Sequence, residues 1–443
     1  MLKVNSKEIM QGDTFLALKG PNKDGHDYID EAIDNGAACI IATHGEYPVK
    51  TIIVDDTKTY LANYLKDLYS DKIEKIKIIG IVGTGGKTVT ADIICQFLNN
   101  LNQKTAYIGT TGFYIDGKKE KLSQDTPDLY NIYELINESV KSECEYLILE
   151  VSSYAILNRH LEGIKFDGCV FTNLILNDIQ NKEEYINTKV EAFKKIKRNG
   201  FAIINKDDPS WEMFSFPQNN NIYYGKKDST YNISDIKITY ENTTFKINDK
   251  QMTINLLGKN NVYDFMAAYS LVSSMSFEDE EIDEATLKLH APDGRYQNIP
   301  YKTNLIIIDY AYKPNTVQSI ITETKSFLKG KLITIIGCKG NEPIENRNLL
   351  GKITTDLSDY VIFTTDNPGH EKEEDILHDM TNNLQKDNFE KIISRKEAIK
   401  KGINMLTEND ILLILGKGHE DVQIIGNDKI PFKDYDEVMK IVK

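Results

Sequence analysis

Glycine, lysine and threonine follow an apolar, β-branched run in the segment from Ile76 to Thr88. The run predicts a buried strand, and Gly83, Gly85 and Gly86 predict a turn in which backbone N–H groups converge on an anion. A helix predicted from Thr88 onward would point its N-terminus at the same place. In a phosphate loop of this kind, Lys87 contacts the β- and γ-phosphates and the Thr88 hydroxyl contacts Mg²⁺. The alternative is a strand-to-helix turn with a surface lysine, because residue 81, where the usual pattern has a glycine, is an isoleucine.

A second group of polar residues follows apolar runs further along the chain. Glu150 ends the run that begins at Tyr146, and Asn173 and Asp178 follow the run that ends at Thr172. Ligands of parallel sheets gather at the carboxyl ends of the strands, so we expect these residues to lie near the phosphate loop. Glu150 either holds Mg²⁺ or accepts hydrogen bonds from nearby amides, and the phosphate loop beside it favours the metal.

Length and composition indicate a multidomain protein of the cytoplasm. A chain of 443 residues suggests about three domains. The net charge of −14 argues against a nucleic-acid-binding surface. No apolar run is long enough to span a membrane, and the N-terminus lacks the apolar core of a signal peptide. The cysteines form no C-x-x-C pair, so we expect free buried thiols at Cys39, Cys95, Cys144, Cys169 and Cys338.

The order of strand-like and helix-like runs predicts an α/β protein. Residues up to about Lys75 form a small α/β unit, and residues 76 to about 294 alternate strands and helices as in a mostly parallel sheet with both faces covered. Residues 304–443 repeat the pattern and predict a second nucleotide-fold-like sheet. Four turns follow its strands and predict a second strand-end crevice: 309–312, 337–340, 366–369 and 416–420.

Eight short motifs lie at residues 24–27, 83–88, 126–128, 150–153, 171–174, 309–311, 366–368 and 416–420. They occur in the order found in the ATP-dependent Mur ligases, and the chain most resembles their MurE type. The resemblance covers essentially the whole chain. It implies three domains: a domain for a UDP-linked precursor (1–75), a central P-loop ATPase (76–296) and a Rossmann-like domain for the incoming amino acid (297–443).

The resemblance implies an ATP-dependent amide ligase. The γ-phosphate passes to a carboxylate of the UDP-linked peptide, and the amine of an amino acid then attacks the acyl phosphate. Such chemistry requires positioning and charge neutralisation more than a protein nucleophile. The implied catalytic residues are Lys87, Glu150 and Lys189, and we expect a monomer.

The resemblance also assigns residues to ATP and Mg²⁺. Lys189, in the spacing Tyr185-x-x-x-Lys189, matches a family lysine that carries a carbamate and binds a second Mg²⁺; the alternative is an ordinary solvated lysine. Thr88, Glu150 and Asp178 are the other implied metal ligands. The implied nucleotide-binding residues are Gly83, Thr84, Gly85, Gly86, Lys87, Thr88, Asn261, Arg295 and Asp309.

The implied substrate residues fall into two sets. The first would contact the UDP-linked precursor: Ser6, Asp24, His26, Thr126, Ser153, Arg159 and His160. The second would contact the incoming amino acid: Arg347, Asp366, Asn367, Glu371 and Glu420.

Several positions depart from the family pattern. Gly85 replaces an asparagine, Tyr154 and Tyr312 replace histidines, Asp178 aligns with a metal-binding histidine, and His160 stands where an arginine is expected. These changes suggest a divergent branch, for example an archaeal pseudomurein peptide ligase or a paralogue with another substrate.

The incoming amino acid and the activity itself have alternatives. Diaminopimelate ligases of this family carry an arginine where Gly369 stands, and acidic residues 342, 345, 371 and 420 lie in the neighbouring motifs, so we predict lysine, then ornithine, over diaminopimelate. The alternative is a small neutral amino acid such as alanine. Other functions are a ligase that adds glutamate to a folate-type cofactor, and a catalytically degenerate protein that binds nucleotide or precursor.

Overall fold

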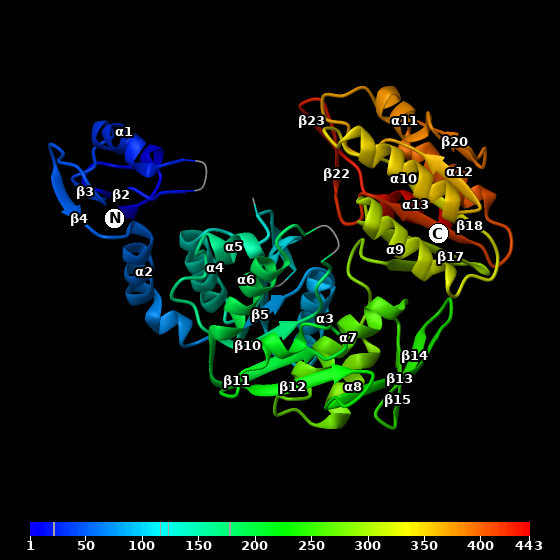
Figure 1. Cartoon of the computed structure of the whole chain (residues 1–443), viewed down its shortest axis with the longest axis horizontal. Helices are drawn as coiled ribbons and strands as arrows, with labels where there is room; N and C mark the ends of the chain where they lie inside the picture. The colour runs from blue at the N-terminus through cyan, green and yellow to red at the C-terminus, as the bar shows by residue number, and fades with distance from the viewer. Residues whose placement is uncertain (21–22, 116, 123, 177–178) are drawn as a thin grey trace. The chain divides into compact units, whose positions relative to one another are not determined.

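The computed structural model describes residues 1–20, 23–115, 117–122, 124–176 and 179–443. Its internal contacts divide the chain into two units (Figure 1). The first comprises Met1–Tyr224 and Ala267–Ser276, and the second comprises Gly225–Met266 and Phe277–Lys443. Among the described residues, no helix is long and apolar enough to cross a membrane.

The N-terminal part of the first unit is a small parallel sheet. Its strands follow the order β1 (Leu2–Lys3), β2 (Thr14–Leu16), β3 (Cys39–Ala42) and β4 (Lys50–Ile53). Phe15 and Ile40 pack with Ile29 of the short helix α1 (Ile29–Asp34). The longer helix α2 (Thr57–Ile73) follows, capped by the Asp56 side chain. This confirms the α/β pattern predicted before the phosphate loop.

A larger sheet carries the phosphate loop. Within the first unit its strands follow the order β12-β11-β10-β5-β9-β6-β7-β8, in which β12 to β6 are parallel and β7 and β8 are antiparallel additions. Helices α3, α4 and α6 contribute buried residues beside it. The strand bounds are β5 (Lys77–Val82), β6 (Thr105–Gly109), β7 (Gly112–Ile115), β8 (Lys118–Glu120), β9 (Tyr146–Glu150), β10 (Phe166–Phe171), β11 (Ile196–Asn205) and β12 (Asn220–Gly225). The helix bounds are α3 (Lys87–Asn100), α4 (Leu129–Lys141), α5 (Ser153–Leu157) and α6 (Lys182–Lys194).

The second unit contains the C-terminal sheet, ordered β16-β17-β21-β18-β19-β20, with β16 antiparallel to β17 and the others parallel. Alternate residues of its strands enter two separate cores. Leu305 and Ile307 pack with α9, α10 and α11, whereas Ile306 and Ile308 pack with α12 and α13. Both faces are therefore covered, as the sequence predicts. The strand bounds are β16 (Gln297–Tyr301), β17 (Asn304–Asp309), β18 (Leu332–Ile336), β19 (Tyr360–Phe363), β20 (Phe389–Lys391) and β21 (Ile411–Leu415), and the helix bounds are α9 (Pro314–Lys325), α10 (Ile344–Leu357), α11 (Glu373–Thr381), α12 (Arg395–Met405) and α13 (Asp434–Val442).

Some elements differ from those expected from sequence. The helix predicted to reach residue 198 ends at Lys194, because Ile196 already pairs with Phe166 at the start of β11. An antiparallel sheet, β13 (Tyr231–Ile238), β14 (Thr243–Ile247) and β15 (Lys250–Ile254), lies where the sequence predicts no element. Helix α7 (Lys259–Val272) begins in the second unit and ends in the first. Helix α8 (Asp279–Leu287) and the hairpin β22 (Val422–Ile425) and β23 (Asp428–Pro431) complete the second unit.

A buried ion pair joins two helices of the C-terminal sheet. Arg395 at the start of α12 donates from Nε and Nη2 to the two carboxylate oxygens of Asp434 in α13, each at 2.7 Å. Its Nη2 also donates to the Leu415 carbonyl at the end of β21, at 2.9 Å. Both side chains are fully buried. The pair therefore fixes both helices to the carboxyl end of the central strand.

Breaking this pair should destabilise the fold. Replacing Arg395 with methionine leaves the Asp434 carboxylate buried without a cation, so we expect the free energy of unfolding to fall by about 3–5 kcal/mol. Adding Asp434→Leu should recover most of the loss, because neither member of the pair is then left as an unpaired buried charge. Denaturant unfolding checks both variants. Equal losses in the single and double variants would show that the charge is not the cause.

Candidate active site

The phosphate loop follows β5 and is held by residues at the end of β10. A Cβ atom on Gly83 would lie 1.9 Å from the Thr172 Oγ1, so only glycine fits there. The Thr172 hydroxyl donates to the Gly85 carbonyl (2.7 Å), and the Asn173 Oδ1 accepts from the Gly85 N–H (2.9 Å). These contacts confirm that Asn173 lies beside the loop.

The loop ends at the N-terminus of α3, where backbone N–H groups are available to bind an anion. Gly86 precedes the helix with φ of 78°, in the left-handed region that favours glycine, and it has no side chain to cap the first turn. The first N–H groups of an α-helix lack acceptors within the helix. The start of α3, with Lys87 and Thr88 as its first residues, is therefore suited to bind phosphate.

Two lysines converge on one carbonyl of this loop. Lys189, from α6, donates from Nζ to the Gly83 carbonyl at 2.8 Å, and Lys87 donates to the same oxygen at 3.3 Å. Lys189 is only 2% exposed, and its ammonium lies 4.7 Å from the centre of the Tyr185 ring. Burial, with the charge of Lys87 as a second cause, lowers the pKa of Lys189 to about 7. Near neutral pH a large share of Lys189 is thus an uncharged amine, able to act as a nucleophile.

Glu150, at the end of β9, is oriented by three hydrogen bonds. Its Oε1 accepts from the Tyr107 hydroxyl and the Thr110 N–H (3.3 Å), and its Oε2 accepts from the Thr110 hydroxyl (3.0 Å). Burial and the Glu150 carboxylate raise the pKa of Tyr107, so its phenol remains a proton donor. A Cβ on Gly109 would lie 2.2 Å from the Tyr107 hydroxyl, so the glycine makes room for this contact.

These residues fit the Mg²⁺ expected with ATP. A carboxylate has about four lone-pair sites, and Glu150 uses three, which leaves one on Oε2 for a hard cation. The Lys189 ammonium does not suit a metal, although its carbamate would supply oxygen ligands. Within the described part of the chain, no group of three or more His, Cys, Asp or Glu side chains is arranged so that it could hold a metal ion. Asp178, also predicted as a ligand, lies outside the described residues.

Removing the Tyr107 hydroxyl should weaken metal binding through Glu150. We expect Tyr107→Phe to raise the Mg²⁺ concentration needed for half-maximal activity severalfold, because the carboxylate loses one of the contacts that orient it. Direct Mn²⁺ binding, followed by electron paramagnetic resonance in the presence of ADP, should weaken in parallel. Tyr114→Phe, in the neighbouring strand β7, is the matched control. An unchanged Mn²⁺ affinity would count against this role for Tyr107.

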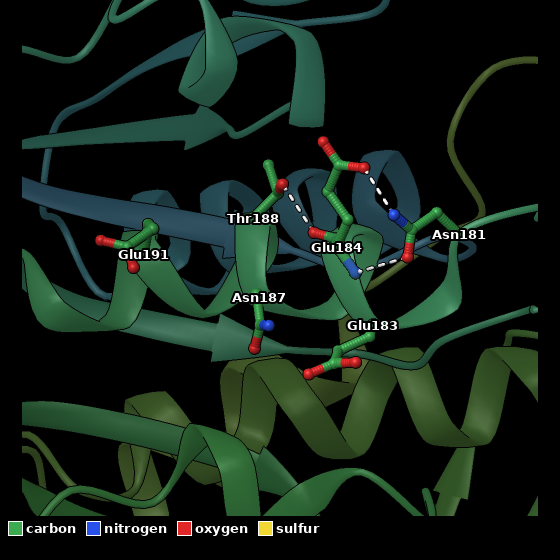
Figure 2. Close-up of a pocket in the computed structure, with 6 residues that line it drawn as sticks. All are labelled: Asn181, Glu183, Glu184, Asn187, Thr188 and Glu191. Carbon is green, nitrogen blue, oxygen red and sulfur yellow. Dashed lines mark hydrogen bonds between the residues drawn. The ribbon is translucent and has the colours of Figure 1, made fainter.

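A separate hollow lies along one side of α6 (Figure 2). Figure 2 shows Asn181 bonded to Glu184 at the start of the helix, which is a capping contact. The lining contains three carboxylates and no cation, so it would repel a nucleotide phosphate. We assign no ligand to it. Its lining residues are Asn181, Glu183, Glu184, Asn187, Thr188 and Glu191.

A cavity of about 590 Å³ in the first unit brings together Ser6, Arg159 and His160 of the predicted precursor residues. Arg159 donates to Asp56 (2.9 Å) and to the hydroxyl of Thr59 (2.7 Å), so its guanidinium is already engaged.

The other predicted precursor residues do not line this cavity. Asp24 and His26 bond to each other at 2.6 Å, and Nε2 of His26 faces Thr43. Thr126 donates to the Glu150 carbonyl at 2.8 Å, and Ser153 begins α5. Their roles stay predictions.

The predicted amino-acid residues in the second unit are mostly paired with one another. Glu420 accepts from Lys339 (2.8 Å), Lys417 (3.1 Å) and Asn367 (2.7 Å). Although burial opposes its charge, the two lysines hold the pKa of Glu420 below its usual value.

A second cluster lies around a buried arginine. Arg347 is only 3% exposed and pairs with Glu371 (2.8 Å) and Asp379 (3.1 Å). Asp366 is fully buried, neither of its carboxylate oxygens has a hydrogen-bond partner among the described residues, and burial raises its pKa.

The residues predicted near the nucleotide in this unit have local contacts. Asp309 accepts from the N–H groups of Tyr296 and Ala311, each at 2.7 Å, and burial raises its pKa. The Arg295 guanidinium lies 4.7 Å from the centre of the Tyr310 ring, and Asn261 donates to the Leu257 carbonyl at 2.8 Å. Contacts of these three with ATP stay predictions.

Comparison with known proteins identifies the family. Residues 81–272 match the Mur ligase middle domain, residues 294–418 the Mur ligase glutamate ligase domain, and residues 1–69 the Mur ligase family catalytic domain. The chain is 33% identical over 460 residues to the UDP-N-acetylmuramoyl-L-alanyl-D-glutamate–2,6-diaminopimelate ligase of Clostridium perfringens, covering 100% of this chain and 94% of the relative. The ligase of the same name from Aquifex aeolicus is 32% identical, covering 100% and 93%.

Solved structures give the same result. A UDP-N-acetylmuramoyl-L-alanyl-D-glutamate–2,6-diaminopimelate ligase superposes with a TM-score of 0.74 at 25% identity, covering 100% of this chain and 94% of that one. A pseudomurein peptide ligase type C from Methanothermus fervidus shares the fold with a TM-score of 0.56 at 17% identity, covering 93% of each chain. The chain belongs to the Mur ligase family.

Proposed function

We propose that this chain is an ATP-dependent ligase that joins an amino acid to the peptide of a UDP-linked cell-wall precursor. The observation that carries the proposal is the similarity, over the whole chain, to ligases named for that reaction. The phosphate loop, with Lys87 and Lys189 beside it and an oriented Glu150, supports it. We propose that the protein acts in the cytoplasm, where ATP is available, and that it is a monomer.

The described residues suit a two-step reaction. A carboxylate oxygen of the precursor attacks the γ-phosphorus, and the bond to the ADP oxygen breaks. The amino-acid nitrogen then attacks the acyl carbon, loses a proton, and phosphate departs. Lys87 and the start of α3 would neutralise charge on the transferred group. Bound Mg²⁺, held by Glu150 and Thr88, would neutralise further phosphate charge.

We also propose that Lys189 carries a carbamate. A neutral lysine amine adds to CO₂, whereas an ammonium has no lone pair to do so. Burial of Lys189 beside Lys87 favours the neutral form, and carbamoylation would relieve the repulsion between the two lysines. The precursor, ATPase and amino-acid roles of residues 1–75, 76–296 and 297–443 belong to the same proposal.

The paired acids of the second unit bear on the choice of amino acid. The predicted preference for lysine rests on carboxylates free to pair with a substrate ammonium. Glu371 and Glu420 instead pair with Arg347, Lys339 and Lys417. For these two acids the premise loses its support, and the relatives reported above are named for diaminopimelate. We therefore propose a diamino acid that also carries a side-chain carboxylate.

One assay tests the proposed function. The protein is incubated with ATP, Mg²⁺, UDP-N-acetylmuramoyl-L-alanyl-D-glutamate and diaminopimelate, and phosphate release and product mass are measured. We expect one ADP and one phosphate for each amide formed. Tight nucleotide binding without turnover would favour the catalytically degenerate alternative. Turnover only with a folate-type acceptor would favour the alternative of a ligase that adds glutamate to a folate-type cofactor.

A further inference from the structure

Two lysines and a glutamate meet at the carboxyl ends of neighbouring strands in the second unit. Lys339 follows β18, and Lys417 and Glu420 follow β21. Oε1 of Glu420 accepts from Lys339, and its Oε2 accepts from Lys417 and Asn367. Both oxygens of the carboxylate are thus occupied by donors of the protein. A substrate ammonium would have to displace one of them.

The two lysines differ in how many of their N–H donors already have an acceptor. Lys417 is fully buried, and its three N–H groups match three acceptors: Asn367 Oδ1 (3.1 Å), Glu420 Oε2 (3.1 Å) and the Val422 carbonyl (2.6 Å). The Lys339 side chain is 21% exposed and, within the described part of the chain, donates only to Tyr310 (3.1 Å) and Glu420 (2.8 Å). Because an ammonium has three donors, Lys339 retains one for a ligand.

Aromatic rings hold the Lys339 ammonium in place. Its Nζ lies 4.7 Å from the centre of the Tyr310 ring and 4.6 Å from that of the Tyr312 ring. The two rings pack edge to face at 5.4 Å. Gly340, the next residue, allows the backbone to pass close to Pro368, because a Cβ on Gly340 would lie 2.1 Å from the Pro368 carbonyl oxygen. The ammonium is therefore positioned beside the Asn367 loop rather than free in solvent.

The charged groups around Lys339 differ in burial and in pairing. Lys339, Lys417 and Glu420 together carry one net positive charge. Asp366 acts on Lys339 electrostatically, but it is fully buried. The carboxylate of Glu371 is engaged by Arg347. A substrate side chain that reaches Lys339 therefore meets an ammonium with one N–H donor still available.

We propose that Lys339 selects the incoming amino acid by binding a carboxylate at the end of its side chain. This inference rests on the proposed function. A side-chain carboxylate gains a charge-assisted hydrogen bond from Lys339, whereas a side chain ending in an ammonium meets a like charge and an occupied Glu420. Gly369, which has no side chain, contributes no cation of its own. Lys339 therefore supplies a cation that position 369 lacks.

A comparison of three amino acids as substrates distinguishes the effect of a distal carboxylate from that of a distal amine. Diaminopimelate carries both an amine and a carboxylate at its distal end, 2-aminopimelate carries the carboxylate alone, and lysine carries the amine alone. We expect kcat/KM of the wild-type chain for 2-aminopimelate to exceed that for lysine by roughly tenfold or more. Amino-acid-dependent phosphate release measures it.

Substitution of Lys339 should reverse this preference. In Lys339→Gln and Lys339→Met we expect activity with 2-aminopimelate to fall about tenfold and activity with lysine to hold or rise, because Glu420 is released. Lys339→Arg should keep the wild-type order, and Lys352→Ala, exposed on α10, should change neither substrate. An unchanged ratio in both Gln and Met variants would overturn the proposal.

A separate measurement distinguishes a failure of the role proposed for Lys339 from a failure of the proposed ligase function. Precursor-dependent ADP formation, with hydroxylamine trapping the acyl phosphate, requires no amino acid. If trapping succeeds and the amino-acid ratio does not depend on Lys339, only the role of Lys339 fails. If no precursor-dependent ADP forms in the wild type, the proposed function fails and the role of Lys339 with it.

Discussion

Lys87→Ala should reduce kcat by about 10³-fold or more. The substitution removes a cation at the start of α3 that would neutralise charge on the transferred phosphoryl group, and such transition-state contacts are each worth roughly 10²–10³ in rate. Lys87 also donates to the Gly83 and Thr84 carbonyls, so some loosening of the loop is expected. Phosphate release with all substrates present measures the loss.

Two further measurements show whether the loss is chemical. The melting temperature without nucleotide should change little, because Lys87 is only partly buried and, among the described residues, its ammonium bonds only to its own loop. Lys141→Ala, at the exposed end of α4, provides the control and should retain full activity. If Lys87→Ala turned over at the wild-type rate, the phosphate loop would have no part in the reaction.

Lys189→Ala should lose activity by about 10²-fold or more, whereas Lys182→Ala should retain it. Both lysines belong to α6, but Lys189 is buried against the phosphate loop and Lys182 is exposed at the first turn. The alanine variant has no amine to carry a carbamate and loses the contact to the Gly83 carbonyl. Phosphate release by the two variants, compared at saturating Mg²⁺, measures the difference.

The carbamate adds a dependence on CO₂ and pH. Because the pKa of Lys189 is lowered to about 7, its neutral amine increases as the pH rises through 7. Enzyme depleted of CO₂ should therefore regain activity on addition of CO₂ and, at a fixed concentration of dissolved CO₂, should do so faster at pH 8 than at pH 6. Lys189→Ala should not respond. Full activity of the wild type in CO₂-free buffer would argue against the modification.

Sequence patterns predict the strands that carry the site better than the contacts within it. The runs at Thr105–Gly109 and Tyr146–Glu150 match β6 and β9 residue for residue, because short apolar runs bounded by polar turns are typical of buried parallel strands. The β13–β15 sheet is not predicted because its strands are rich in polar residues and the alternation of apolar residues, at Phe245 and Ile247 and at Met252 and Ile254, is short.

Contacts between distant side chains are harder to infer. Tyr107 lies 43 residues from Glu150, and Lys339 lies 81 residues from Glu420. One signal is present in the sequence: a tyrosine inside a buried strand needs a partner for its hydroxyl. The pairing of Glu371 with Arg347 and of Glu420 with Lys339 and Lys417 is not predicted, because a sequence does not show which lysine or arginine the fold places beside an acid.

The strand order of the C-terminal sheet has a consequence for biosynthesis. β21 lies between β17 and β18, although it follows both by many residues. On the ribosome, β17 and β18 emerge first and expose unpaired edges until residues 411–415 appear. We therefore expect this sheet to close only after nearly the whole chain has been synthesised. Nascent chains stalled before β21 should be especially prone to aggregation and chaperone binding.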